Sequence, residues 1–267
     1  MRNWTAAGLG LISLLGLGGC ATPAAESDGA SNAAHIVTPS DETDNRRRAR
    51  IRLELASGYY EEGKTEFALD ELKQVIAIDP TLPEAYNLRG LIYMRLNDMR
   101  AAEESFRKAL SLNSRDSGTY HNLGWLQCQL GRYPEATRSF EAALTNPIYG
   151  GRAKTLMTLG LCQARAGQRP EAERSLARSY ELDAGNPITG YNLATLLYLR
   201  GDYEKAQFYI RRLNNSDLAN SETLWLGIKV ENRMRDSVAM EQLSDQLRKR
   251  YPQSKERAAL ERRAFDE

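Results

Sequence analysis

A small residue recurs along this chain with a period of about 34 residues, and a second small residue follows each one twelve positions later. Small side chains are needed where two helices cross closely, because a bulky side chain would hold the axes apart. The period therefore predicts a chain built from repeated pairs of antiparallel helices. The pairs are Ala56/Ala68, Gly90/Ala102, Gly124/Ala136, Gly160/Ala172, Ala194/Ala206 and, more weakly, Gly227/Ala239.

Larger apolar side chains recur in phase with the small ones and are expected to fill the remaining helix contacts. The period and the helix pair resemble the tetratricopeptide repeat. That resemblance implies an all-α solenoid of stacked helix pairs wound as a right-handed superhelix. The recurring large residues are Tyr59, Tyr93, Phe106, Phe140, Leu176 and Ile210.

Turn residues divide the body, residues 46–267, into six repeats. Asp79-Pro80 stops one helix, and Pro83 and Pro187 suit the first turns of others. The predicted repeats are 49–82, 83–116, 117–152, 153–186, 187–219 and 220–253. The third repeat carries two extra residues, which we place in the turn at 146–151. Residues 254–267 are predicted to form a capping helix, because a terminal repeat must turn a polar face outward.

The N-terminus has the pattern of a secretory signal. Residues 1–3, Met-Arg-Asn, form a short segment made basic by Arg2, and residues 9–19 are apolar but too short to span a bilayer. Residues 17–20, Leu-Gly-Gly-Cys, resemble the lipobox cleaved by bacterial lipoprotein signal peptidase. We expect removal of residues 1–19 and a covalent lipid on Cys20, whose acyl chains would anchor the chain. An ordinary cleaved signal, or a short membrane anchor with an incidental cysteine, is the alternative.

The residue after the lipobox cysteine bears on location. Ala21 stands where lipoproteins of enteric type that stay in the inner membrane carry Asp. That resemblance points to the outer membrane, with the body facing the periplasm. Residues 20–45 contain the lipidated cysteine and a polar linker, predicted to be disordered. The arginines at 46, 47, 48 and 50 then fit a solvated helix face, or contact with anionic head groups or an acidic partner.

Charge and motifs exclude several classes of function. Without Arg2, 35 of the 36 basic residues remain against 35 acidic residues, so no global field favours nucleic acid. The two histidines, His35 and His121, belong to no metalloprotease, hydrolase or phosphate-loop motif. We therefore expect no enzyme, no metal site, no small-molecule substrate and no cofactor beyond the lipid on Cys20.

Two cysteines remain after lipidation, Cys128 and Cys162. They fall on the first helices of the third and fourth repeats. Neighbouring helices pack about 8–10 Å apart, which exceeds the Cα separation of about 7 Å that a disulfide tolerates. We expect two buried free thiols, with a disulfide as the less favoured alternative even in an oxidising compartment.

The first helix of each repeat should line the concave face of the solenoid. Aromatic and Met side chains there are typical binding anchors, and Asn can pair with a peptide backbone. Because no Lys/Arg clamp for a chain-end carboxylate stands out, we expect an apolar peptide or helix as ligand. The predicted groove residues are Leu53, Tyr60, Asn87, Leu91, Met94, Asn122, Trp125, Met157, Tyr191, Asn192, Tyr198 and Trp225.

Three segments carry a closer resemblance. They are residues 122–125 (Asn-Leu-Gly-Trp) with the turn at 146–149, residues 224–229 (Leu-Trp-Leu-Gly-Ile-Lys) and residues 246–252 (Gln-Leu-Arg-Lys-Arg-Tyr-Pro). With the lipobox and six repeats, they resemble the type IV pilus biogenesis lipoproteins called PilF or PilW. Arg89, at a usually apolar core position, and the longer linker depart from that pattern.

The resemblance implies a pilotin. Such an outer-membrane lipoprotein binds secretin subunits in its groove and promotes their localisation and multimerisation for the pilus exit pore. We place the main contact on the N-terminal repeats, at Leu53, Tyr60, Leu91 and Met94. Two alternatives stay open: an adaptor for periplasmic proteases or peptidoglycan enzymes, and a structural part of an envelope machine.

Overall fold

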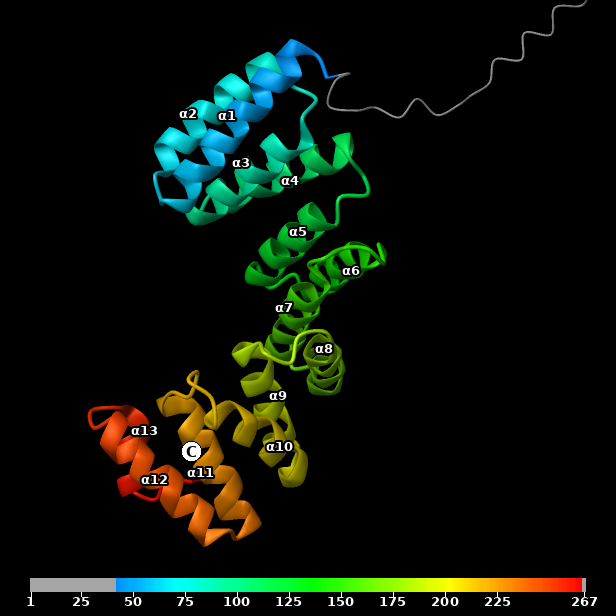
Figure 1. Ribbon diagram of the computed structural model, residues 1–267. Coiled ribbons are helices and arrows are strands. Elements are labelled where there is room, and N and C mark those ends of the chain that lie inside the picture. Colours follow the sequence, from blue (N-terminus) through cyan, green and yellow to red (C-terminus); the bar gives the residue numbers. More distant parts are fainter. Residues whose placement is uncertain (1–41, 266–267) are drawn as a thin grey trace, which may run out of the picture. The chain divides into compact units, whose positions relative to one another are not determined.

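The computed structural model describes residues 42–265, so the predicted signal peptide, Cys20 and most of the predicted linker lie outside the described residues. The compact unit begins at Thr43. In the described residues of that unit there are thirteen α-helices and no strand (Figure 1). The predicted all-α class is confirmed.

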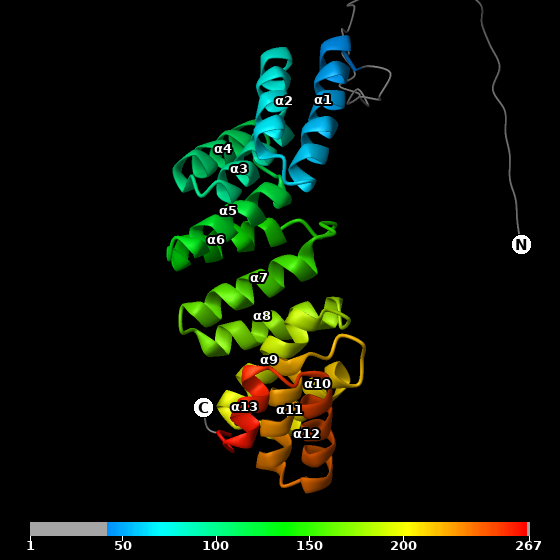
Figure 2. The ribbon, with the colours of Figure 1, turned by 90° about the vertical axis from the view of Figure 1, so that its left-hand side faces the viewer.

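The helices form six consecutive pairs and one cap. Each pair packs against the next along the chain (Figure 2), and the last helix packs against both members of the sixth pair. This is the predicted solenoid of six helix pairs with a C-terminal capping helix. The helices are α1 (Asp44–Glu61), α2 (Thr65–Ile78), α3 (Pro83–Arg95), α4 (Met99–Leu112), α5 (Ser117–Gln129), α6 (Tyr133–Leu144), α7 (Arg152–Arg165), α8 (Arg169–Leu182), α9 (Pro187–Arg200), α10 (Tyr203–Asn214), α11 (Ser221–Met234), α12 (Ser237–Arg250) and α13 (Lys255–Glu261).

The recurrent small residues lie at the crossings within the pairs, as predicted. A Cβ atom on Gly90 of α3 would lie 2.5 Å from the Phe106 ring of α4, closer than carbon atoms can approach. In the next pair, a Cβ atom on Gly124 would lie 2.9 Å from the Phe140 ring. Ala239 of the weaker sixth pair is only partly buried, whereas the other alanines of the period are fully buried: Ala56, Ala68, Ala102, Ala136, Ala172, Ala194 and Ala206.

Two helix boundaries differ from the sequence-based expectation. Helix α1 begins at Asp44, inside the predicted linker, because Thr43 caps it by accepting a hydrogen bond from the backbone N–H of Arg46 at 3.2 Å. Helix α13 ends at Glu261 instead of continuing toward residue 267. Arg263 adopts a left-handed backbone conformation, with φ of 54°, which ends the helix and redirects the chain.

The extra residues of the third repeat lie in the turn between α6 and α7. Residues 145–151 make this connection, whereas residues 113–116 suffice between α4 and α5. The Arg152 guanidinium donates hydrogen bonds to the carbonyl oxygens of Leu144 at 2.8 Å and Asn146 at 3.3 Å, which closes the longer turn.

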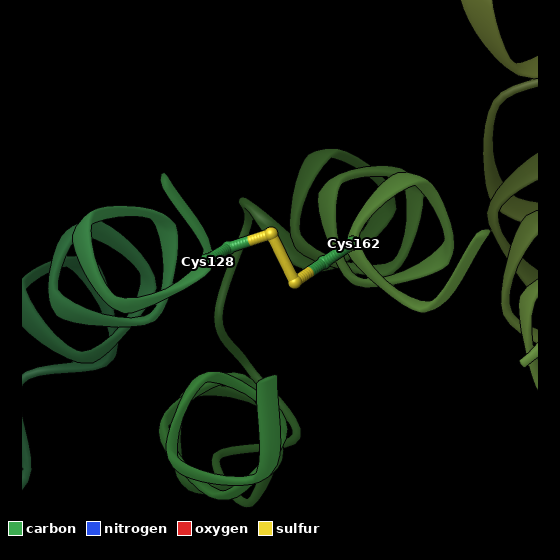
Figure 3. The surroundings of a disulfide bond; sticks show 2 residues. All are labelled: Cys128 and Cys162. Carbon is green, nitrogen blue, oxygen red and sulfur yellow. A yellow bond between two sulfur atoms is a disulfide. The ribbon is translucent and has the colours of Figure 1, made fainter. Parts of the chain in front are cut away.

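The expectation of free thiols is wrong, because Cys128 of α5 and Cys162 of α7 form a disulfide (Figure 3). Their Cα atoms are 5.9 Å apart. Axis separation was the wrong measure: each Cα lies about 2.3 Å from its helix axis. Two Cα atoms on facing sides can therefore approach to about 4–5 Å when the axes are about 9 Å apart. The bond links the first helices of two neighbouring repeats.

Arg89 of α3 is accommodated without disturbing the core. Its Nε donates a hydrogen bond to the Oγ of buried Ser105 at 3.0 Å. Its guanidinium also lies 4.9 Å from the centre of the Tyr86 ring. The long side chain thus packs its stem while its charge finds polar and aromatic partners.

Candidate functional site: the inner face of the first helices

The first helices of the pairs form the inner face of the described solenoid. Helix α1 contacts α3, α3 contacts α5, and the same holds through α5, α7, α9 and α11, whereas no second helix contacts another second helix. Curvature therefore places α1, α3, α5, α7, α9 and α11 on the concave side. Among residues 42–265, no helix is long and apolar enough to cross a membrane, and no three His, Cys, Asp or Glu side chains cluster as metal ligands.

The structure places the predicted groove residues on these helices, and all but one are half-buried. Trp225 is the exception, at 9% exposed, because Phe265 stacks against it with ring centres 5.7 Å apart. The half-buried residues are Leu53, Tyr60, Asn87, Leu91, Met94, Asn122, Trp125, Met157, Tyr191, Asn192 and Tyr198. Half-burial fixes a side chain by packing while leaving part of its surface to a ligand.

Two groove asparagines contact each other. The Nδ2 of Asn122 on α5 donates a hydrogen bond to the Oδ1 of Asn87 on α3 at 3.0 Å. The Nδ2 of Asn192 instead donates to the carbonyl oxygen of Ile188, one turn earlier on α9, at 2.8 Å. The hydrogen bond between Asn122 and Asn87 holds these two amides in a fixed orientation between neighbouring repeats. Each amide still has further hydrogen-bonding capacity.

His121 lies on α5 beside the groove residues but belongs to the core. It is 7% exposed, and its Nδ1 hydrogen-bonds with the Thr155 Oγ1 of α7 at 2.9 Å. Its ring packs edge-on against Phe140. Burial, with a smaller contribution from the positive charge of Lys154, lowers the pKa of His121 to about 4. The side chain is therefore neutral at physiological pH.

Cationic side chains lie over the groove aromatics, a feature that the sequence-based reading missed. The Arg95 guanidinium lies 3.8 Å from the centre of the Tyr60 ring and donates a hydrogen bond to the Tyr60 carbonyl oxygen. The Arg165 guanidinium lies 5.2 Å from the Trp125 ring. Arg95 and Arg165 occupy the same position in their repeats, thirteenth from 83 and from 153. This shared position is the sequence pattern from which the two cation–ring contacts could have been predicted.

The C-terminal end of the groove repeats this arrangement with a lysine. The Lys229 Nζ lies 5.5 Å from the centre of the Tyr198 ring and 5.8 Å from that of Trp225. Burial lowers the pKa of Lys229. The groove thus offers aromatic surfaces together with positive charge, and the apolar peptide or helix expected as ligand stays a prediction.

These features define a helical-repeat scaffold whose concave face can hold a peptide, a class that works by protein interaction. Comparison with known proteins agrees. Profiles of the tetratricopeptide repeat match residues 57–97, 83–116, 105–138 and 187–207. A TPR repeat-containing protein of Pseudomonas aeruginosa is 30% identical over 77% of this chain and 77% of its own length.

Longer matches connect the chain to pilus proteins. The type IV pilus assembly protein PilF of Pseudomonas aeruginosa is 28% identical over 94% of this chain and 95% of its own length. The solved PilF structure has a TM-score of 0.74, with 26% identity, 82% of this chain and 99% of that chain covered. A structure of PilW, a type IV pilus biogenesis factor, gives 0.70, with 28% identity and coverages of 79% and 97%. The chain belongs to the PilF/PilW-like family of tetratricopeptide-repeat proteins.

Proposed function

We propose that this protein acts in type IV pilus biogenesis as a non-catalytic scaffold that binds a segment of the secretin in its concave groove. The relatives that match almost the whole described body are named for type IV pilus assembly and biogenesis. The resemblance of residues 122–125, 224–229 and 246–252 to pilotins adds the secretin as the partner. In this proposal the chain brings secretin subunits to the outer membrane and supports their multimerisation.

One observation carries the binding role: the inner face holds half-buried aromatic, Leu, Met and Asn side chains on five successive first helices, α1, α3, α5, α7 and α9. A side chain that is packed on one side loses little conformational freedom when a ligand covers the other side. Met adapts to irregular apolar surfaces, and Asn pairs with backbone N–H and C=O groups. An extended or helical segment with apolar side chains fits this surface.

The cations over the aromatic rings indicate further which side chains a ligand segment should carry. Arg95, Arg165 and Lys229 each lie within 6 Å of a groove ring. A segment that adds carboxylates to its apolar side chains would satisfy both features, and its binding would weaken as salt is raised. We place the first contact on the N-terminal repeats, at Tyr60, Leu91 and Met94, because the proposed lipid anchor precedes them in the chain.

Membrane attachment is the second half of the proposal. A lipid on Cys20, after removal of residues 1–19, would keep the repeats at the periplasmic side of the outer membrane. The groove would then hold secretin subunits where they assemble. No covalent chemistry on the secretin is required, since binding and concentration at the membrane suffice.

The test is the amount of heat-resistant secretin multimer in outer-membrane fractions from wild type, a deletion strain and a Cys20→Ser strain. Multimers should be lost or mislocalised in both mutants. Normal multimers in the deletion strain would refute the pilotin role and favour an adaptor for periplasmic proteases or peptidoglycan enzymes. Normal multimers in Cys20→Ser alone would refute the lipid anchor and leave the groove in place.

A further inference from the structure

The fourth residue of the fifth repeat departs from the pattern of the three repeats before it. From the first repeat to the sixth, this position holds Arg52, Tyr86, Tyr120, Leu156, Gly190 and Thr223. Tyr86 and Leu156 are buried, so their side chains fill space beside the first helix of their repeats. Gly190 brings no side chain to the corresponding place. A Cβ atom added to Gly190 would meet the Tyr180 ring only at an ordinary contact distance of 3.7 Å.

A cavity of about 210 Å³ lies at Gly190, and we call it the Gly190 pocket. It is bounded by the end of α8, the turn that leads to α9, the start of α9, the last turns of α10 and the loop after α10. This volume is below the range of about 300–1,000 Å³ typical of ligand sites, so the pocket suits a single side chain. Leu218 in its wall is 51% exposed, so the pocket meets the protein surface there.

Tyr86 shows how a large side chain is held at this position in the second repeat. Its hydroxyl donates a hydrogen bond to the carbonyl oxygen of Pro80, in the turn before α3, at 3.1 Å. The Nζ of Lys108, on α4, lies 5.8 Å from the centre of its ring. A carbonyl group of the preceding turn and a cation of the second helix therefore contact the buried tyrosine.

The same two positions line the Gly190 pocket in the fifth repeat. Ala184, in the turn before α9, has the repeat position of Pro80. Arg212, on α10, has the repeat position of Lys108. Both are wall residues of the pocket. The wall thus contains the counterparts of two residues that contact the tyrosine of the second repeat, while glycine takes the place of the tyrosine itself.

The ring of Tyr180, on α8, takes up only part of the space left at Gly190. At the repeat position of Tyr180 the earlier repeats carry Ile76, Leu110 and Leu144. The larger ring forms part of the pocket wall, and the pocket remains open beside it. The Tyr180 hydroxyl is buried and has no hydrogen-bond partner among the described residues. Tyr180 therefore does not make the contact with the preceding turn that the Tyr86 hydroxyl makes.

We propose that the Gly190 pocket binds a tyrosine side chain presented by a partner protein. The partner's ring takes the space that Tyr86 fills in the second repeat, and Arg212 lies beside it as Lys108 lies beside Tyr86. The partner's hydroxyl donates to the carbonyl oxygen of Ala184. Exposed Leu218 adds apolar surface for the residues that flank the tyrosine.

This inference goes beyond the proposed function, because none of the predicted groove residues lines the Gly190 pocket. The pocket lies on α8, α9, α10 and their connections, whereas the proposed secretin contact lies on α1 and α3. A partner at the pocket does not compete for the groove residues. Failure of tyrosine binding would leave the secretin role intact, and normal secretin multimers in a deletion strain would leave the pocket result standing.

The test is a titration of the isotope-labelled full chain with the peptide acetyl-Gly-Tyr-Gly-amide, followed by amide chemical shifts in NMR. The shifts of Gly185 and Leu218 should saturate with a dissociation constant of about 1–10 mM, because one side chain buries little surface. The peptide with Phe in place of Tyr should bind about threefold or more weakly, since it cannot donate to the turn carbonyl. The peptide with Ala in place of Tyr should cause no shift.

Two substitutions at one residue provide the matched comparison. Gly190→Leu introduces the side chain that Leu156 carries in the fourth repeat, so it should fill the pocket and abolish the shifts caused by the Tyr peptide. It should also raise the melting temperature, since it fills a cavity. Gly190→Ala changes the helix propensity in the same direction but leaves most of the pocket empty. Its affinity for the Tyr peptide should stay within about twofold of the wild type, because the added Cβ atom makes only an ordinary contact.

Two results would overturn the proposal. One is equal affinity of the unchanged chain for the Tyr, Phe and Ala peptides, or no binding of any of them. The other is binding of the Tyr peptide to a folded Gly190→Leu as tight as to the wild type. The peptide series on the unchanged chain decides the question even where Gly190→Leu does not fold.

A second copy of the chain is the competing occupant. Sedimentation velocity of the full chain, Gly190→Leu and Gly190→Ala decides between the two. A monomer in all three cases is the expected result. Self-association that is present in the full chain and in Gly190→Ala but absent in Gly190→Leu would assign the pocket to a tyrosine of another copy. That result would overturn the assignment to a partner protein.

Discussion

The carboxylate of Glu231, fully buried on α11, accepts hydrogen bonds from the Arg211 Nε at 2.7 Å and from its Nη2 at 3.0 Å. Arg211 extends from α10, so this bidentate pair joins the fifth and sixth repeats. Gln207 donates to the same carboxylate at 2.8 Å, and Arg211 also reaches Asp236 at 2.9 Å. A buried charge with this many donors is stable only while its partners stay in place.

Removing the arginine should therefore destabilise the C-terminal repeats. Arg211→Met keeps most of the apolar stem but leaves the Glu231 carboxylate with one donor, so we expect a loss of about 2–3 kcal/mol in the free energy of unfolding. Urea denaturation followed by circular dichroism measures it. Arg178→Met, at an exposed position on α8, should change stability by less than about 0.5 kcal/mol. Equal effects of the two substitutions would show that the ion pair contributes nothing.

Two glycine-to-alanine substitutions, one at a helix crossing and one in open space, test the role of the small residues in the repeat period. Gly90→Ala places a Cβ atom 2.5 Å from the Phe106 ring, so we expect a loss of about 1–3 kcal/mol in the free energy of unfolding. Gly58 lies in α1 with no atom within 4 Å of its Cβ position. Gly58→Ala should stabilise the chain by about 0.5–1 kcal/mol, because alanine favours the helix. Thermal unfolding curves of both variants give the comparison; a neutral Gly90→Ala would mean that the crossing can open without cost.

The Cys128–Cys162 disulfide closes a loop with a sequence separation of 34. Restricting the unfolded chain by a loop of this length stabilises the folded state by about 3–4 kcal/mol in the chain-entropy treatment. Reduction with dithiothreitol should lower the urea midpoint of the wild type. The double variant Cys128→Ala/Cys162→Ala should unfold at a lower urea concentration from the start and should not respond to the reductant. An unchanged wild-type midpoint after complete reduction would contradict the prediction.

The sequence allowed the fold to be predicted because one contact is repeated. Each small residue that lets α3 cross α4, or α5 cross α6, recurs in phase with the large residue that covers it, such as Gly90 with Phe106 and Gly124 with Phe140. Six occurrences of one local rule define the stacking. The positions of the groove residues followed from the same periodicity.

Contacts between repeats could not be predicted as well. The approach of Cys128 to Cys162 depends on which sides of α5 and α7 face each other, which the period alone does not specify. The cations over Tyr60 and Trp125 also come from the next repeat along the chain. Phe265 reaches Trp225 only because Arg263 turns the chain after α13. No turn residue such as Gly stands at this position, so the sequence did not predict the turn.

The buried His121 predicts a pH dependence of stability. Its pKa is about 4 in the folded chain and near the ordinary value of 6.5 when unfolded, so the unfolded chain binds more protons between those values. The free energy of unfolding should therefore fall by up to about 3 kcal/mol as the pH drops from 6.5 to 4, and this contribution should level off below pH 4. Urea titrations of wild type and His121→Gln from pH 7 to pH 4 isolate the contribution of His121 to the free energy of unfolding. Parallel stability curves for the two proteins would show that His121 does not titrate as inferred.

The N-terminal part of the groove makes the last prediction. Met94 on α3 is half-buried beside Leu91 and packs against the cluster around Phe106, so part of its side chain remains available to a ligand. Met94→Glu should weaken secretin binding by about tenfold, because a ligand that covers this position would desolvate an unpaired carboxylate.

The Met94→Glu variant should keep its fold, because a half-buried position lets the carboxylate reach water. A circular dichroism melt checks this. Phe208→Glu, at an exposed aromatic position on α10, is the control that adds the same charge away from the groove. Surface plasmon resonance with purified secretin periplasmic domains measures both variants. If Met94→Glu and Phe208→Glu bind as tightly as wild type while both remain folded, the groove at α3 is not the contact; if both bind equally weakly, added negative charge alone is responsible.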